Sequence, residues 1–489
     1  MKHLTILFLI LICFTATSQS GEPLVVRNIT LIDGNGGPAI ENQTIVSIDG
    51  RITEIGNDGD INAPRKSQIV DGKGKFLLPG FIDSNVHASL YGGSSRPETI
   101  VKYGERNTEL IAEFVQLELK HGVTTIRDSF GALLPLMEVR DKIAKGEFIG
   151  PRMLVAGNIV GWGGPFSVSW GLTRESEITA FQEHWNDFIT QGSGEAMLDM
   201  TPGELRIAIN KYLDLGPDFI KYGGTSHFAN PEMITFSPRT QKVLVDETHK
   251  RGLVAETHST NLEGLLLSIE AGIDLIQHPE HSSRELTDEI INEILERGVI
   301  GAMLSNTLTG DVWQQHLVKK TAAIAAAKKK DEGFPKDRKK STAEQRRELQ
   351  QQELWMDIAR INAEKMIKAG CILTIGTDNY HGAAPELQRR PKPENQEPGI
   401  GSIIAIEGLV ELGMTPAQAI MSATKHGAMA ARKLEEIGTV EVGKIADMII
   451  LEEDPLKEIS NIRTLSTVIQ NGKIVDLTNL PEQPVFRKK

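Results

Sequence analysis

The chain has 489 residues, of which 40% are hydrophobic and 24% are charged. This length allows up to about three domains with large apolar cores, and the composition excludes collagen-like, disulfide-stapled and wholly disordered proteins. Lys and Arg number 53 against 65 Asp and Glu, which gives a net charge of −12. Nucleic acid is therefore not an expected partner, because contacts to phosphates need clustered cations.

Residues 1–20 have the form of a secretory signal peptide. A positively charged start precedes an apolar run from Leu4 to Phe14, and Ala16-Thr17-Ser18 supplies small residues for cleavage. The alternative is a membrane anchor, but this run is too short to cross about 30 Å of hydrocarbon. The sequence therefore predicts a periplasmic or secreted protein with no membrane span. The mature chain would keep Cys371 as its one cysteine, which excludes an internal disulfide.

Short β-branched runs with turn residues between them stand at both ends of the mature chain. They are Leu24–Leu31, Gln43–Ile48 and Arg51–Ile55, then Ala446–Leu451, Ser466–Ile469 and Lys473–Val475. Asp49-Gly50 and Asn471-Gly472 are turn dipeptides of the kind that join antiparallel strands. We expect one small β-sandwich domain built from residues 21–79 and 425–489.

The central part of the chain alternates apolar runs with loops and helical stretches. Eight candidate strands can be counted, at Leu77–Ile82, Thr124–Ile126, Met153–Val155, Phe219–Ile220, Leu253–Ala255, Leu275–Ile276, Val299–Leu304 and Ile372–Ile375. Eight alternations of strand and helix are typical of a (β/α)8 TIM barrel, which we place at residues 80–424. A doubly wound open sheet is the alternative, since periodicity alone does not exclude it.

One polar segment interrupts this alternation between the seventh and eighth candidate strands. Thr321–Gln352 is rich first in Ala, then in Lys, then in Glu, Gln and Arg. We interpret it as a helical insertion at about residues 310–355 whose charged faces are solvated. A lid over the active site is an alternative role for it.

Metal-competent side chains follow five of the candidate strands. They are His87, Lys221, His258, His278 and Asp378. A barrel brings the carboxyl ends of distant strands to one rim, so the large separations in sequence are no obstacle to a shared site. Imidazoles with a carboxylate suit zinc, with manganese or iron as alternatives.

These residues stand within motifs that resemble those of the amidohydrolase superfamily, in its imidazolonepropionase-like and Xaa-Pro dipeptidase-like branch. The resemblance covers essentially the whole mature chain. Its marks are Leu78–Asp83, Gly122–Asp128, the stretch from His258 to His278, Gly376-Thr377-Asp378, and Gly438–Asp447 with Asp454-Pro455-Leu456 after it. Each fragment alone is weak, but the ordered set is specific.

The resemblance implies a barrel flanked by a small β-sandwich and one or two divalent metals. In members with two metals a carboxylated lysine at the end of strand four bridges them, and Lys221 matches that position. The alternative is a lysine that pairs with a carboxylate. One departure stands out, because the usual His-x-His of strand one is Asn85-Val86-His87 here. An amide oxygen is a weaker zinc ligand than an imidazole, so one metal position should be weakened or lost.

The ligand set and the resemblance together predict hydrolysis of a carbon–nitrogen bond by water activated on a metal. We assign Asp378 as the general base. The expected substrates are small molecules or short peptides, among them dipeptides, N-acyl amino acids and cyclic amides. Two alternatives stay open: a deaminase of ring amidines on the same metal site, and a catalytically impaired binding relative. A homo-oligomer is expected by analogy with the family.

Other residues near the expected rim have less certain roles. His281 and His381 could point into the pocket or serve as structural groups, and His227 is equally ambiguous. The stretch Gly161–Phe166 could present an aromatic wall to a substrate. A packed loop over the end of the barrel is the competing interpretation of that stretch.

Overall fold

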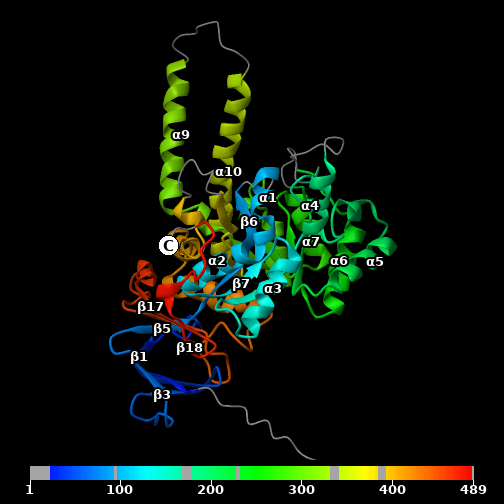
Figure 1. Cartoon of the computed structure of the whole chain (residues 1–489). Helices are drawn as coiled ribbons and strands as arrows, with labels where there is room; N and C mark the ends of the chain where they lie inside the picture. The colour runs from blue at the N-terminus through cyan, green and yellow to red at the C-terminus, as the bar shows by residue number, and fades with distance from the viewer. Residues whose placement is uncertain are drawn as a thin grey trace, which may run out of the picture.

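The structure, a computed structural model, describes residues 22–92, 96–167, 169, 178–226, 232–330, 341–383 and 393–486. The expected signal peptide and His227 lie outside these ranges. Two assemblies of strands are visible in Figure 1, a barrel wrapped by helices and a second sheet attached below it. The barrel carries every residue that we single out as a candidate ligand.

The barrel is built from parallel strands in two hydrogen-bonded sheets, with the orders β15-β6-β7-β8 and β14-β13-β12-β11-β10-β9. The strands are β6 (Phe81–Gly92), β7 (Val123–Asp128), β8 (Arg152–Val155), β9 (Ile159–Val160), β10 (Phe219–Gly223), β11 (Val254–His258), β12 (Leu275–Gln277), β13 (Ile300–Met303), β14 (Leu373–Ile375) and β15 (Asn379–Ala383). The chain passes from β8 directly into β9 and from β14 directly into β15, which joins the two sheets into a ring. The expected (β/α)8 fold class is confirmed, and the alternative of an open doubly wound sheet is wrong.

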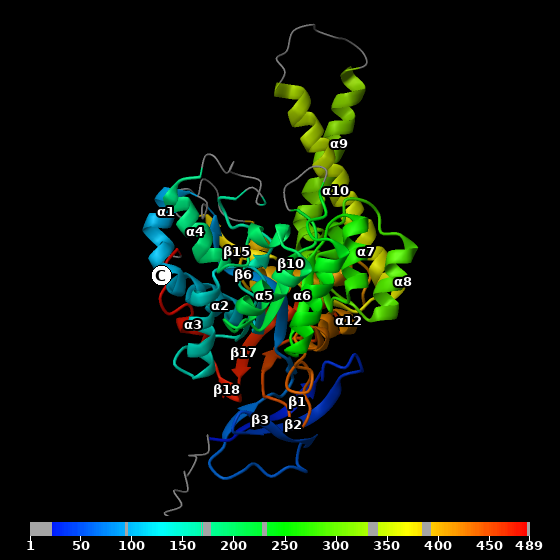
Figure 2. The same ribbon diagram turned by 90° about the vertical axis from the view of Figure 1, so that its right-hand side faces the viewer.

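Helices surround this ring in alternation with the strands (Figures 1 and 2). They are α1 (Pro97–Tyr103), α2 (Asn107–Lys120), α3 (Leu133–Ala144), α4 (Ala180–Thr190), α5 (Pro202–Leu213), α6 (Pro238–Lys250), α7 (Leu262–Ala271), α8 (Asp288–Arg297), α9 (Gly310–Lys330), α10 (Ser341–Ala369), α11 (Ile400–Glu411), α12 (Pro416–Met421) and α13 (Gly427–Ala430). Local sequence fixes several of their ends. Thr201 and Glu204 form a capping box at the start of α5, and Gly298 ends α8 in a left-handed conformation with φ 64°.

The second sheet joins strands from both ends of the chain. Its hydrogen-bonded order is β18-β17-β16-β5-β1-β2-β3, with β4 paired to β1. The strands are β1 (Leu24–Leu31), β2 (Ile40–Ile48), β3 (Arg51–Asn57), β4 (Gln68–Asp71), β5 (Phe76–Pro79), β16 (Met448–Leu451), β17 (Leu465–Gln470) and β18 (Lys473–Ile474). An apolar cluster that includes Ile45, Leu77 and Ile450 packs them together. The expected pairing of the two termini is present, while the boundaries at 79/80 and 424/425 stay predictions.

The first candidate barrel strand, Leu77–Ile82, is wrong as a single element. Leu77 and Leu78 belong to β5, which pairs antiparallel with β16, whereas Phe81 and Ile82 begin β6 of the barrel. Gly80 separates the two sheets. A Cβ at this position would lie 2.2 Å from Oγ1 of Thr124, so a larger residue cannot be fitted between the strands. One apolar run therefore supplies two different sheets, a division that hydrophobicity alone does not reveal.

The polar insertion forms two long helices, α9 and α10, which rise away from the barrel (Figures 1 and 2). This confirms its helical character, while residues 331–340 lie outside the described ranges. The lower part of α10 belongs to the barrel body, because Ala359, Ala363 and Met366 are fully buried there. Among the described helices, none is long and apolar enough to cross a membrane.

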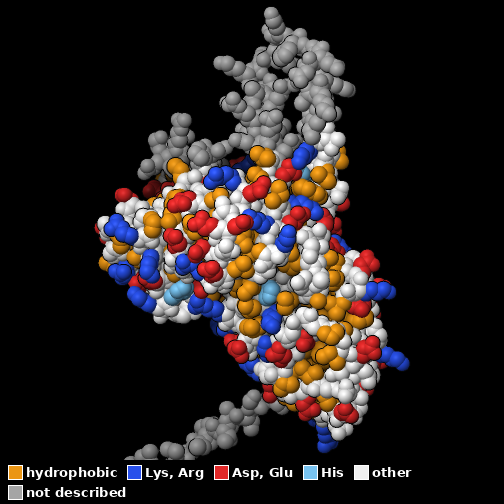
Figure 3. Space-filling view, turned by 180° about the vertical axis from the view of Figure 1, so that it is seen from behind, with side chains coloured by type: hydrophobic (Ala, Val, Ile, Leu, Met, Phe, Trp, Pro, Cys, Tyr) orange, Lys and Arg blue, Asp and Glu red, His pale blue; other side chains and the backbone are white. Residues whose placement is uncertain are grey.

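The face of the molecule seen in Figure 3 carries acidic and basic side chains interspersed with one another. Side chains of opposite charge also pair on the surface, as in the contact of 2.8 Å between Arg360 and Glu411. Such interspersed charge is typical of a solvated surface.

Candidate active site

The five predicted ligand residues all lie in or just after the barrel strands. His87 lies in β6, Lys221 in β10 and His258 at the end of β11, while His278 follows β12 and Asp378 stands between β14 and β15. The lysine and the three histidines are buried, with exposures of 1% to 7%. The carboxyl ends of five strands therefore present metal-competent side chains toward one region, as a TIM barrel does with its active-site residues.

Two of these residues have an unusual backbone conformation. His278 has φ 40° and Asp378 has φ 56°, in the left-handed region that costs a residue with a side chain about 1–3 kcal/mol. Backbone hydrogen bonds to neighbouring strands hold both in place, from His278 to the carbonyl of Ala302 at 2.7 Å and from Asp378 to that of Asn85 at 2.8 Å. The surrounding sheet thus maintains a strained backbone at two candidate ligands. Backbone strain of this kind is characteristic of functional sites.

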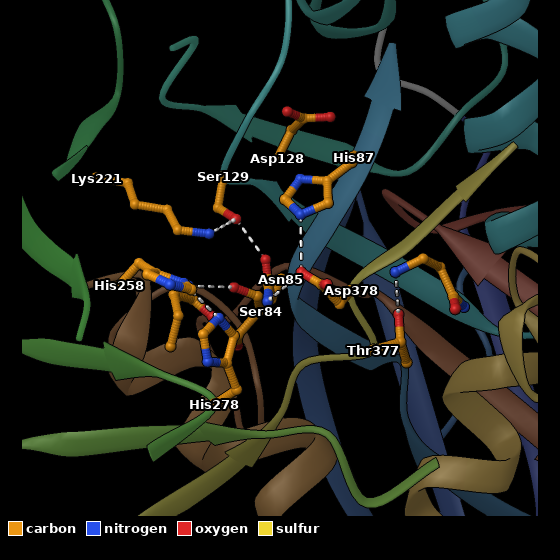
Figure 4. A network of polar contacts seen from close by, with 12 residues as sticks. Ser84, Asn85, His87, Asp128, Ser129, Lys221, His258, His278, Thr377 and Asp378 are labelled. Atoms are coloured by element: carbon orange, nitrogen blue, oxygen red, sulfur yellow. Dashed lines mark hydrogen bonds and ion pairs between the residues drawn. The ribbon is translucent and has the colours of Figure 1, made fainter. Parts of the chain in front are cut away.

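The structure brings the candidate ligands together as two pairs (Figure 4). Nε2 of His87 lies 2.8 Å from Oδ1 of Asp378. Nδ1 of His258 lies 3.0 Å from Nε2 of His278, with the ring centroids 4.7 Å apart. Within the described ranges, no three His, Cys, Asp or Glu side chains converge into a finished metal cage. The candidate metal-binding atoms therefore form two separate pairs, His87 with Asp378 and His258 with His278.

Asn85 connects these residues to Lys221 through a chain of polar contacts drawn in Figure 4. Its Nδ2 donates to Oδ1 of Asp378 at 3.0 Å, and its Oδ1 accepts a hydrogen bond from the Ser129 hydroxyl. Nζ of Lys221 in turn donates to Ser129 Oγ at 3.2 Å. Ser129 was missed by sequence reasoning. The available signal was its place directly after β7, where a polar residue reaches the same rim.

Charge at the site is set by burial and by close neighbours. Burial lowers the pKa of Lys221, and the carboxylates of Asp378, Glu256 and Asp128 oppose that shift only in part. Burial acts to raise the pKa of Asp378, but His87, His278 and Lys221 outweigh it and hold that pKa well below its ordinary value. The Asp378 side chain is 41% exposed, so this carboxylate is open to solvent. Burial also raises the pKa of Asp128 to about 8.

A buried ion pair links β7 to β11, the strand that carries His258. Nη2 of Arg127 is 2.8 Å from Oε2 of Glu256, with side-chain exposures of 1% and 0%. The guanidinium also lies over the ring of Phe219 at 4.2 Å, and Gln277 donates to Oε1 of Glu256 at 2.7 Å. Sequence reasoning missed Glu256, although a charged residue inside a fully buried strand requires a partner.

Aromatic rings stand beside the imidazoles. The ring of Phe130 lies 5.9 Å from that of His87, and the ring of Trp162 lies 4.9 Å from that of His258. Trp162 comes from the predicted aromatic stretch Gly161–Phe166, and it is a buried residue that packs against Phe130 with centroids 6.4 Å apart. Phe130 was missed by the sequence analysis.

The two ambiguous histidines take different places. His281 lies at the site, with its ring 5.9 Å from that of His278 and 4.3 Å from that of Trp355 in α10. His381 turns away from the site, because its Nε2 lies 2.7 Å from the carbonyl oxygen of Leu110. The first remains a candidate for substrate contact, and the second has a structural role.

Comparison with known proteins gives a consistent result. The model of the amidohydrolase family matches residues 76–475. Among curated relatives, imidazolonepropionase of Geobacillus sp. (strain WCH70) is 22% identical, covering 93% of this chain and 98% of that protein. Ochratoxinase of Aspergillus niger is 24% identical, covering 94% of this chain and 88% of that protein.

Solved structures resemble the chain over almost its full length. Molinate hydrolase superposes with a TM-score of 0.81 at 30% identity, covering 96% of this chain and 97% of that one. Phenylurea hydrolase B also gives 0.81, at 27% identity with coverage of 95% and 99%. A Xaa-Pro dipeptidase with bound methionine gives 0.71 at 21% identity and shares the fold, with coverage of 93% and 100%. The chain therefore belongs to the amidohydrolase family, whose members hydrolyse carbon–nitrogen bonds.

Proposed function

We propose that this protein is an exported, metal-dependent hydrolase that cleaves an amide, peptide or urea carbon–nitrogen bond. The observation that carries the proposal is the meeting of an ionised, solvent-reached carboxylate, Asp378, with the imidazole of His87 at 2.8 Å. A purely structural role needs neither the strained backbone at Asp378 nor the buried His258–His278 contact.

The residues present fit a divalent cation. His87, His258, His278 and Asp378 would hold it, since imidazole nitrogens and a carboxylate are the donors that zinc prefers. Nδ1 of His87 is buried and has no hydrogen-bond partner among the described residues. A buried polar atom is normally paired, so this nitrogen is available to bind a metal ion. When bound, the ion would lower the pKa of a water ligand toward about 7 and polarise the substrate carbonyl.

Asp378 has the properties of a general base in this reaction. Its carboxylate stays ionised at neutral pH, because His87, His278 and Lys221 overcome the effect of burial on its pKa. It would accept a proton from the attacking water and then return that proton to the leaving nitrogen. Asn85 fixes the orientation of the carboxylate by donating to Oδ1 at 3.0 Å, which leaves Oδ2 to take the proton.

Lys221, in its carboxylated form, is the residue that we assign to a second ion. Carboxylation requires a neutral amine, and burial lowers the pKa of this lysine. The amine also points toward Asn85 through Ser129. Asn85 replaces the imidazole usual at its position, so we expect the second ion to bind weakly.

The substrate that we favour carries an uncharged aromatic or apolar group next to the scissile carbonyl. The buried rings of Phe130 and Trp162 stand beside His87 and His258, so the surroundings of these imidazoles are apolar and suit an apolar substituent. Phenylurea hydrolase B and molinate hydrolase, both with a TM-score of 0.81, are relatives whose names are compatible with substrates of this kind. Dipeptides, N-acyl amino acids and cyclic amides are the other candidate substrates.

The test is a panel of these substrates and of ring amidines, applied to the purified mature chain with and without added divalent metal. The proposal expects metal-dependent release of an amine from at least one amide, peptide or urea. Deamination of ring amidines alone, or no turnover with any metal, would contradict it. An Asn85→His variant should bind a second ion more tightly, and unchanged metal stoichiometry would overturn the role given to Asn85.

Export and assembly are separate parts of the proposal. Cleavage near residue 20, detected as a shortened N-terminus on protein recovered from outside the cytoplasm, would support the signal peptide. Light scattering on the mature protein would test the homo-oligomer.

A further inference from the structure

The last described residues of the chain run along helix α2. Nζ of Lys120 donates to the carbonyl of Leu480 at 2.8 Å. The amide of Glu482 donates to Oε1 of Gln116 at 2.8 Å, and Nε2 of Gln116 donates back to the Glu482 carboxylate at 3.2 Å. Residues 480–486, which we name the C-terminal strap, therefore follow one face of α2, and the red end of the chain lies beside α2 in Figure 2.

The strap ends on a buried carboxylate. Oε2 of Glu113, in a residue that is 1% exposed, accepts hydrogen bonds from the amides of Val485 at 2.7 Å and Phe486 at 3.0 Å. Two backbone amides of the strap thus converge on one side-chain oxygen of Glu113. These hydrogen bonds depend on the path of the strap rather than on its side chains. Glu113 thus fixes where the Phe486 side chain enters the molecule.

The ring of Phe486 packs among three rings from different elements. It lies 4.8 Å from Tyr103 of α1, 5.8 Å from Tyr91 of β6 and 5.5 Å from His381 of β15, measured between ring centroids. All three contacts are edge-to-face, the arrangement that aromatic rings favour. Phe486 therefore bridges β6 and β15 near their carboxyl ends.

These two strands carry the two halves of the His87–Asp378 contact. β6 contains His87, four residues before Tyr91, and β15 begins directly after Asp378. Their parallel pairing is irregular, since Tyr380 pairs with His87 but His381 pairs with Tyr91. Regular ladder hydrogen bonds therefore do not by themselves fix this stretch, and side-chain packing has to contribute.

We propose that Phe486 is a positioning residue, which holds the ends of β6 and β15 against each other and so keeps His87 and Asp378 in contact. This inference goes beyond the proposed function, because it assigns a role at the site to a residue more than a hundred positions from Asp378 and outside the barrel strands. The proposal predicts that removal of the Phe486 ring increases the mobility of β6 and β15 more than that of the other barrel strands. A displacement of catalytic groups by about 1 Å can cost up to a hundredfold in rate.

The test compares Phe486→Ala, Phe486→Leu and a control, Phe181→Ala, in the full mature chain. Phe181 lies in α4 and is 42% exposed, so its loss should leave the site unaffected. Hydrogen–deuterium exchange measures the opening of peptides covering 86–92 and 378–383. We expect Phe486→Ala to raise exchange there about tenfold and to lower kcat about tenfold with little change in KM. Phe486→Leu should recover most of both, and the control should change neither.

Unchanged exchange in the two strands of Phe486→Ala would overturn the proposal. So would an increase of the same size throughout the barrel, because that result means a general loss of stability. Faster exchange with full kcat would also contradict it. The exchange measurement needs no substrate, so it decides whether Phe486 clamps these strands even if the proposed hydrolysis fails.

Discussion

The active-site end of the barrel and the terminal sheet differ in the side chains that they bury, since charged groups and imidazoles are prominent at the barrel end and aliphatic groups in the terminal sheet. The terminal sheet is held by an apolar cluster that includes Ile45, Leu77 and Ile450. The barrel end instead buries Lys221, Glu256 and several imidazoles, each of which costs free energy to remove from water. The difference teaches where function lies in this chain, because the barrel end buries a lysine, a glutamate and several imidazoles close together near the ends of its strands. Substitutions in the terminal sheet should accordingly affect stability alone, whereas substitutions at the barrel end should affect activity, stability or both.

The largest effect is expected at the general base. Asp378→Asn keeps the shape of the side chain but removes its ability to accept a proton. We expect kcat to fall by about 10²–10⁴, with the protein still folded. The check is kcat on the best substrate of the panel, with unfolding followed by circular dichroism.

The matched control for this carboxylate is Asp288→Asn, because the Asp288 side chain is 90% exposed and pairs with Lys365 at the surface. It should leave kcat unchanged. Wild-type turnover in Asp378→Asn would remove that residue from the chemistry.

Breaking the buried ion pair tests whether polar burial at the barrel end costs stability. Arg127→Leu would leave the buried carboxyl group of Glu256 without its guanidinium partner. We expect a loss of about 3–5 kcal/mol in the free energy of unfolding, measured in urea. The double variant Arg127→Leu/Glu256→Leu should recover much of that loss, because no unpaired buried carboxyl group remains. Equal stability of the single and double variants would contradict this explanation.

The terminal sheet should respond in stability alone. Ile450 is 1% exposed in β16, and Ile450→Ala removes buried methyl groups from its apolar cluster. We expect a loss of about 2–5 kcal/mol in the free energy of unfolding and unchanged kcat per folded molecule. Denaturant titration and active-site-normalised kinetics measure the two quantities. A large fall in kcat under conditions where the variant is fully folded would contradict the assignment of a purely stabilising role to the terminal sheet.

The smallest expected effect concerns Cys371, which lies just before β14 and away from the strand ends that carry the ligands. Burial raises the pKa of this thiol to about 11, so the thiolate fraction at pH 8 is lower than for an ordinary cysteine. Iodoacetamide labelling at pH 8 should speed up about a hundredfold when the protein is unfolded in urea. Labelling at the same rate in folded and unfolded protein would show that the thiol is not protected.

Much of the architecture could be predicted from sequence, because periodicity and turn chemistry are local signals. The run from Leu24 to Leu31 is a strand with those bounds, and the apolar runs of the barrel lie within or beside strands. The division at Gly80 could not be predicted, since it depends on Thr124 from a distant strand. His87 and Asp378, on strands that are distant in sequence, lie in contact in the structure.

The missed parts of the site are those fixed by contacts across the barrel. Ser129 matters because Lys221 and Asn85 lie on either side of it. Glu256 matters because Arg127 of β7 reaches it from a strand that is not its neighbour. Neither relation leaves a spacing pattern along the chain. The same holds for Phe486, whose partners come from α1, β6 and β15.

The most direct test of the account is the metal content of the purified chain, measured by elemental analysis alongside activity. The comparison is between wild type, His258→Asn/His278→Asn and the control His249→Asn, a half-buried histidine that pairs with Asp274 at 2.9 Å outside the site. We predict about one or two divalent ions per chain in wild type and control, and loss of most metal and activity in the double variant. A chain that keeps its metal without His258 and His278, or hydrolyses substrate fully after chelation, would contradict the account.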